Sequence, residues 1–97
     1  MILHEQLTAL GRWYHKIELP DGTFTPGHAS IQHKFKIIEP YLPSNLIGAR
    51  VLDLGCNSGG FSFELAKKGA SVVGVEKTTH YFKQALFLQL VLPYTHC

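Results

Sequence analysis

The stretch that decides the fold is RVLDLGCNSGGFSFELAKKGASVVGVE, residues 50–76. It contains two short apolar runs, 51–54 and 71–75, and continuous hydrophobicity of this kind is typical of strands buried on both faces of a parallel sheet. Between them, a glycine-rich turn opens an apolar segment that ends in Lys67-Lys68-Gly69, a typical C-terminal signal of a helix. The order strand, helix, strand predicts a right-handed βαβ unit with parallel strands.

A helix is predicted on each side of this unit. On the carboxyl side, the apolar segment from Thr78 or Thr79 to about Leu92 is interpreted as a buried helix. On the amino side, residues 31–47 carry apolar residues at helical spacing. These are Ile31, Phe35, Ile38 and Leu42. Pro40 leaves the end of that helix undefined, because proline interrupts helical hydrogen bonding.

The first 30 residues form a turn-rich leader. A short amphipathic stretch predicts one or two helical turns, and its apolar residues are Ile2, Leu3, Leu7 and Leu10. Residues 17–19 and 23–25 alternate like two short strands, and Pro20-Asp21-Gly22 between them suits the corner of a hairpin. We therefore expect two parts: residues 1–30 as a leader with a hairpin, and residues 31–97 as part of an α/β domain.

Composition bounds the class of protein. Hydrophobic residues make up 45% of the 97 residues and charged residues 16%, which excludes a disordered chain. The net charge of +2 is too small to indicate a nucleic-acid or membrane surface, and no segment is long enough to span a bilayer. Two cysteines, Cys56 and Cys97, make no disulfide framework, so we expect a reducing, cytoplasmic location.

The glycine-rich turn has the properties of a nucleoside site. A strand that ends in such a turn and opens a helix directs backbone N–H groups into the crevice above the carboxyl ends of the strands. Glu76 ends the next strand and is expected in the same crevice, where its carboxylate is able to accept hydrogen bonds from both ribose hydroxyls. The pattern therefore indicates an adenosine-containing ligand.

Spacing separates two classes of such ligands. The dinucleotide pattern G-x-G-x-x-G would fall on 55, 57 and 60, where Asn57 replaces the glycine that lets the pyrophosphate approach. The methyltransferase pattern, acidic-x-G-x-G-x-G, matches Asp53, Gly55 and Gly59, and asparagine tolerates the left-handed backbone at 57 better than most residues. Only the second pattern explains an acidic residue inside an apolar strand, so methyl transfer is favoured over hydride transfer.

The same stretch resembles motif I and the start of motif II of class I S-adenosylmethionine-dependent methyltransferases. Residues 13–22 (WYHKIELPDG) and Thr25-Pro26-Gly27 are similar to the leader of bacterial methyltransferases related to the tRNA wobble-uridine carboxymethyltransferases. Residues 81–85 resemble the helix after the second strand. The resemblance, which runs to about residue 91, implies a Rossmann-like methyltransferase fold. Only its first βαβα portion is present, preceded by a short hairpin and a helix.

The resemblance assigns cofactor contacts residue by residue. It implies that Asp53 orients the methionine end of S-adenosylmethionine, that Glu76 holds the ribose hydroxyls, and that Lys77 lies beside the adenine ring. The backbone that receives the amino-acid and ribose portions is Gly55, Cys56, Asn57 and Gly59. A carboxylated form of the cofactor, as in the tRNA-modifying relatives, stays open, as does the choice between a small-molecule and a tRNA substrate. No catalytic base is assigned.

Several of these and other residues also have a simpler interpretation. Asp53 suits the N-terminus of the following helix as a dipole partner, and Glu76 alone would be a solvated strand end. Three histidines fit no metal-ligand spacing and are interpreted as surface residues: His15, His28 and His33. Trp13 and Tyr14 are expected in the core rather than in a substrate pocket. Lys67 and Lys68 are expected to be a solvated helix end.

Three hypotheses follow. The first is the cofactor-binding part of a methyltransferase whose seven-stranded sheet is represented here by two strands, so that the chain is expected to be a truncated reading frame. The second is a nicotinamide-dependent oxidoreductase domain. The third is a non-enzymatic remnant or interaction module, because two strands leave sheet faces and an edge uncovered. A dimer or a partner is then expected to cover the open sheet.

Overall fold

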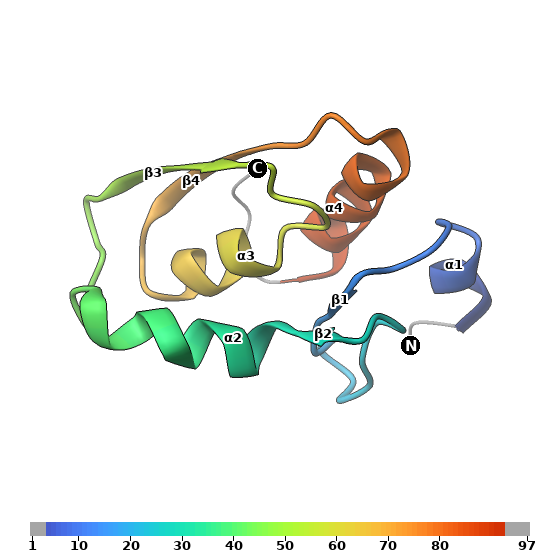
Figure 1. The fold of residues 1–97 in the computed structure, drawn as a ribbon, viewed down its shortest axis with the longest axis horizontal. Helices are drawn as coiled ribbons and strands as arrows, with labels where there is room; N and C mark the ends of the chain where they lie inside the picture. The colour runs from blue at the N-terminus through green and yellow to red at the C-terminus, as the bar shows by residue number, and fades with distance from the viewer. Residues whose placement is uncertain (1–3, 93–97) are drawn as a thin grey trace.

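The computed structural model describes residues 4–92 (Figure 1). The elements in chain order are α1 (His4–Thr8), β1 (His15–Lys16), β2 (Ala29–Ser30), α2 (Ile31–Ile38), the 3₁₀ turn η1 (Glu39–Tyr41), β3 (Arg50–Leu54), α3 (Gly60–Lys67), β4 (Ser71–Val75) and α4 (Thr79–Val91). Within the described residues, no helix has the length and apolar character needed to cross a membrane. Ile2, Leu3, Pro93 and Cys97 lie outside this range, so the predictions that involve them are not addressed.

The predicted βαβ unit is present. Strands β3 and β4 pair in parallel over their full length, from Arg50 opposite Ser71 to Leu54 opposite Val75, and α3 connects them. Helix α4 follows β4 and begins at Thr79, as predicted. The result is a small α/β arrangement that is compatible with part of a Rossmann-like fold.

Helix α2 ends where the prolines begin. It starts after Ser30, whose hydroxyl accepts a hydrogen bond from the His33 N–H at 3.3 Å and thereby caps the helix. The helix stops at Ile38, and Pro40 lies in the 3₁₀ turn that follows. Glu39 in that turn forms an ion pair with Lys68 at 2.9 Å. Lys68 therefore joins the end of α3 to η1, and the prediction that it belongs to a solvated helix end was wrong.

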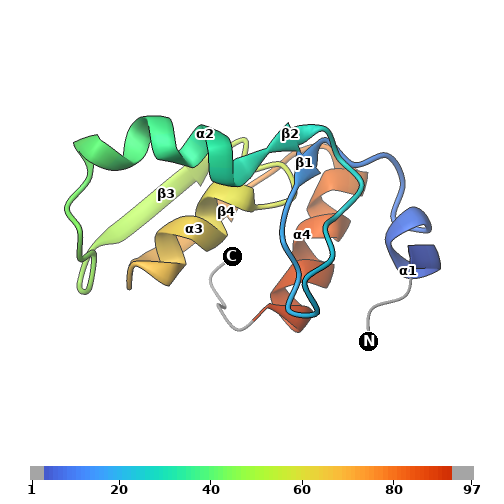
Figure 2. The same cartoon turned by 90° about the horizontal axis from the view of Figure 1, so that it is seen from below.

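The sheet is covered on one face only. Figure 1 shows the two strands along the top, α3 beneath them and α2 below α3, and Figure 2 shows both helices on that lower side. Val72 is buried in a small cluster with Leu46 and Ala70. On the opposite face Leu52 and Leu54 are 61% and 74% exposed. The prediction that both faces are buried was therefore wrong, because no element among residues 4–92 packs on the upper face.

The predicted hairpin in the leader is present in a minimal form. Glu18 and Phe24 form one antiparallel bridge, and the Leu19 N–H donates to the Thr23 carbonyl at 2.7 Å. The sequence did not reveal a second pairing, in which His15 and Ala29 lie opposite each other in the parallel strands β1 and β2.

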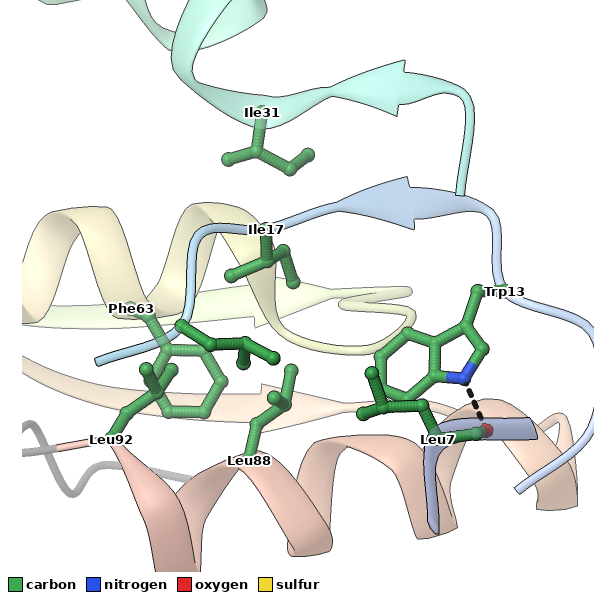
Figure 3. Close-up of a cluster of buried hydrophobic side chains, with 8 residues drawn as sticks. Leu7, Trp13, Ile17, Ile31, Phe63, Leu88 and Leu92 are labelled. Atoms are coloured by element: carbon green, nitrogen blue, oxygen red, sulfur yellow. Dashed lines mark hydrogen bonds between the residues drawn. The ribbon is translucent and has the colours of Figure 1, made fainter. Parts of the chain in front are cut away.

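The main hydrophobic core lies away from the sheet (Figure 3). It joins the leader to α2, α3 and α4 through eight buried side chains: Leu7, Trp13, Ile17, Leu19, Ile31, Phe63, Leu88 and Leu92. The indole N–H of Trp13 donates to the Leu7 carbonyl at 2.7 Å, so this ring is buried with its polar group satisfied. The core interpretation is confirmed for Trp13. It was wrong for Tyr14, which is 38% exposed.

Helix α4 packs with one face. Gln84 and Leu88 are fully buried, whereas Leu90 is 85% exposed. The side-chain N–H groups of Gln84 donate to the carbonyls of Leu10 and Arg12 at 3.1 and 2.8 Å, which fixes the leader against the helix. The interpretation of this segment as a buried helix is therefore right for one face and wrong for the other.

Candidate functional site

The loop between β3 and α3 turns sharply through three left-handed residues. Gly55, Asn57 and Gly59 have φ angles of 69°, 59° and 92°. Asn57 thus adopts the conformation that its place in the glycine pattern predicts, and its side-chain oxygen accepts a hydrogen bond from the Ser58 N–H at 2.8 Å. Side-chain support of this kind is why asparagine substitutes for glycine in left-handed turns.

The start of the loop is fastened to the end of β4. The N–H groups of Gly55 and Cys56 both donate to the Val75 carbonyl, at 2.7 and 3.0 Å. These two amides are therefore satisfied within the protein, and any ligand contact made by these residues has to use other backbone atoms. An added side chain at Gly55 would meet nothing within 4 Å, so the bare backbone there borders open space.

Glu76 connects the loop to the start of the α4 connection. One carboxylate oxygen accepts from the Asn57 N–H at 2.7 Å, and the other accepts from the Thr78 N–H at 2.9 Å. The hydrogen bond from Thr78 is the main cause that lowers the pKa of Glu76 from its ordinary value, and the N–H of Asn57 adds to it against the opposing effect of burial. The structure thus brings Glu76 and the glycine loop together, and the carboxylate is more than a solvated strand end.

Asp53 lies beneath the loop and contacts α3. It is half-buried opposite Gly74, and its carboxylate accepts a hydrogen bond from the Ser62 hydroxyl at 2.7 Å. Ser62 is buried in the first turn of α3, and nothing in the sequence pattern singled it out. This position agrees with the interpretation of Asp53 as a partner of the helix N-terminus and leaves its carboxylate beside the loop.

His15 brings the leader into contact with the loop. Its Nδ1 atom accepts a hydrogen bond from the Gly60 N–H at 3.3 Å, and its ring meets that of Phe61 edge-on at 6.4 Å. The prediction that His15 lies on the surface was wrong, since only 6% of it is exposed. Sequence reasoning missed it because the contact joins residues 45 positions apart. His28 and His33 are exposed, as predicted.

The remaining candidates occupy the margins of the site. Lys77 is exposed, Cys56 is buried, and Lys67 pairs with Glu64 at 3.0 Å. Because Cys97 is not described, the absence of a disulfide stays a prediction. Among residues 4–92 there is no group of three histidine, cysteine or acidic side chains arranged to hold a metal ion.

His15 makes stability depend on pH. Burial, with a smaller effect from the Lys34 charge, lowers the pKa of His15 from 6.5 to about 4, against an opposing effect from Glu76. The unfolded chain therefore binds a proton in this window that the folded protein does not, so stability is expected to fall as the pH decreases from 6.5 towards 4.

The measurement is the urea midpoint at several pH values. The His15→Asn variant keeps an acceptor for the Gly60 N–H but cannot titrate, so its midpoint is expected to change less over the same range. Glu76 acts in the same direction only below the ordinary glutamate pKa of 4.5. A parent protein whose midpoint stays constant between pH 6.5 and 4.5 would contradict the prediction.

Comparison with known proteins finds methyltransferases. The ubiquinone biosynthesis O-methyltransferase of Haemophilus ducreyi is 33% identical over 75 residues, covering 77% of this chain and 31% of the relative. The enzyme of the same name from Idiomarina loihiensis is 36% identical over 74 residues, covering 76% of this chain and 28% of the relative. A 23S rRNA (uracil(1939)-C(5))-methyltransferase of Shewanella amazonensis is 58% identical over 38 residues, covering 39% of this chain and 9% of that protein.

The similarity is confined to part of each relative. The chain spans about a third of the length of the first two methyltransferases. No protein-family model matches the chain. The three relatives share the class of reaction in their names and differ in what they modify, so the comparisons support methyl transfer in general.

Proposed function

We propose that this chain is the cofactor-binding part of an S-adenosylmethionine-dependent methyltransferase that acts in the cytoplasm. The observation that carries the proposal is the junction of Glu76 with the glycine loop. Each Glu76 oxygen accepts one backbone N–H and, because a carboxylate offers about four lone-pair sites in total, each keeps capacity for a ribose hydroxyl. The methyltransferase names of the similar proteins support the same class.

The residues present fit such a cofactor. Bare backbone at Gly55 borders open space, and the left-handed Asn57 brings its N–H to Glu76. We propose that Glu76 holds the ribose, that Asp53 orients the methionine end, and that Lys77 lies beside the adenine. The loop backbone at Gly55, Cys56, Asn57 and Gly59 completes the site.

The chemistry divides between cofactor and protein. When bound, S-adenosylmethionine supplies the methyl group on a positively charged sulfur. The protein binds the cofactor and fixes its orientation, which is the main contribution of a protein to this kind of displacement. The proposal extends to the carboxylated cofactor and to either a small-molecule or a tRNA substrate, since it rests on the nucleoside end of the site alone.

A calorimetric titration tests the proposal against the oxidoreductase alternative. S-adenosylhomocysteine is expected to give saturable binding to the parent protein, whereas NAD⁺ is expected to give none. The Asn57→Gly variant, which completes the dinucleotide pattern, is expected to remain unable to bind NAD⁺. Binding of NAD⁺ that improves in this variant, without binding of S-adenosylhomocysteine, would overturn the proposal in favour of hydride transfer.

One observation favours a second candidate, an interaction module formed by two copies of this chain. Besides Leu52 and Leu54, the bare face of the sheet carries Val73 and Val75, which are 58% and 49% exposed. Identical apolar faces can stack on each other around a two-fold axis. Sedimentation velocity over a range of concentrations tests this candidate, and a monomer at every concentration would reject it.

A further inference from the structure

A hollow outside the cofactor loop lies between the leader and the start of α4. It has a volume of about 640 Å³ and is lined by Arg12, Trp13, Tyr14, Pro26, His28 and Tyr81, among others. This volume is within the range of about 300–1,000 Å³ that small-molecule sites occupy. None of these residues belongs to the proposed cofactor contacts.

Two walls of the hollow are connected to the cofactor site. Tyr14 is adjacent to His15, whose Nδ1 atom accepts the Gly60 N–H. Tyr81 lies in the first turn of α4, and its ring packs against that of His80 at 4.1 Å. Figure 1 shows β1 and the start of α4 at the end of the sheet where the loop after β3 lies. The hollow is therefore on the side from which an acceptor would approach a bound cofactor.

The walls are largely aromatic. Tyr14 and His28 meet edge-on with ring centroids 5.2 Å apart, and Trp13 and Tyr81 add two further rings to the lining. Aromatic walls favour a planar aromatic guest through stacked and edge-to-face contacts.

The charge of the hollow selects an acid. Arg12 lines it, and no carboxylate is among its lining residues. Lys34 adds positive charge nearby, since its ammonium group lies 5.2 Å from the centre of the Tyr14 ring and donates to the Tyr14 hydroxyl at 3.3 Å. The Arg12 carbonyl is held by Gln84 at 2.8 Å, so the backbone that carries the guanidinium is fixed. Arginine is suited to bidentate binding of a carboxylate.

We propose that this hollow is the acceptor site and that it takes a small planar aromatic carboxylic acid. The aromatic walls hold the ring and the Arg12 guanidinium pairs with the carboxylate. The assignment rests on the proposed methyltransferase function, because it is the cofactor loop beside the hollow that makes the bound acid an acceptor.

The test uses ligand-observed NMR titrations of the full chain with 4-hydroxybenzoate and with phenol, which has the same ring but no carboxylate. We expect 4-hydroxybenzoate to bind at least about 10-fold more tightly than phenol, and Arg12→Ala to remove most of this difference, since a charge-assisted hydrogen bond contributes about 1.5–3 kcal/mol. Lys36→Ala removes the same charge from an exposed position on α2 and is expected to bind like the parent protein.

Three results would overturn the assignment. They are equal binding of phenol and 4-hydroxybenzoate, an Arg12→Ala variant that binds the acid like the parent protein, and tighter binding of uridine 5′-phosphate than of the acid. Titration of each variant with S-adenosylhomocysteine shows that it is folded and tests the cofactor site separately. Failure of that titration in the parent protein contradicts the methyltransferase function, whereas failure with the acid alone contradicts only the acceptor site.

Discussion

The Glu76→Gln variant is expected to bind S-adenosylhomocysteine about 100-fold more weakly than the parent protein, a loss of about 2.7 kcal/mol. The carboxylate accepts the N–H groups of Asn57 and Thr78 and, in the proposed complex, two ribose hydroxyls as well. The amide of glutamine has one oxygen and one donor group, so it turns an N–H towards one of these N–H groups. It also removes the charge that strengthens the remaining bonds.

The comparison needs a variant with the same chemical change elsewhere. Glu5→Gln removes a carboxylate from an exposed position in α1, and its affinity is expected to equal that of the parent protein. Isothermal titration calorimetry of the three proteins gives the affinities, and circular dichroism shows whether each is folded. Equal affinity of folded Glu76→Gln and parent protein would remove Glu76 from the site.

The Gly60→Ala variant is expected to lose about 2 kcal/mol of stability, because it overpacks the contact between the leader and α3. Gly60 begins α3, where alanine would ordinarily stabilise the helix by about 0.5–1 kcal/mol. Here an added Cβ atom would collide with Ile31 Cγ1 and would lie 2.9 Å from His15 Nδ1. Both neighbours are buried and have no room to move, so the collision outweighs the gain in helix propensity.

Gly48→Ala provides the control for this second experiment. Gly48 has a φ of +86° with nothing within 4 Å of an added Cβ atom, so its cost is the backbone strain alone, about 1 kcal/mol. Urea denaturation of both variants measures the difference. A Gly60→Ala variant as stable as the parent protein would show that His15 and Ile31 do not press on the start of α3.

The sequence was most informative where the signals are local. The apolar runs of β3 and β4, the glycine turn between them and the cationic end of α3 predicted these elements close to their observed bounds. The same local signal placed Glu76 near the loop, because the carboxyl ends of adjacent parallel strands meet at one edge of a sheet. The left-handed conformation of Asn57 also followed from its place in the glycine pattern.

The features that the sequence did not reveal depend on contacts between distant parts of the chain. His15 resembles any other histidine until the leader folds onto Gly60, and the pairing of β1 with β2 has no periodic signal because each strand has two residues. The exposure of Leu52 was missed for a related reason. A hydrophobic run shows that a strand is suited to burial but does not show whether any segment packs on it.

The main core joins Leu7 near one end of the described chain to Leu88 and Leu92 near the other. Contacts of such wide sequence separation close late, since a long loop has to lose its freedom before they form. On the ribosome, where a chain grows at roughly 5–20 residues per second, the leader therefore waits several seconds for α4 to be synthesised. During that interval Trp13 and Ile17 lack the helix that buries them, so the nascent leader is a natural substrate for chaperones that bind exposed apolar segments.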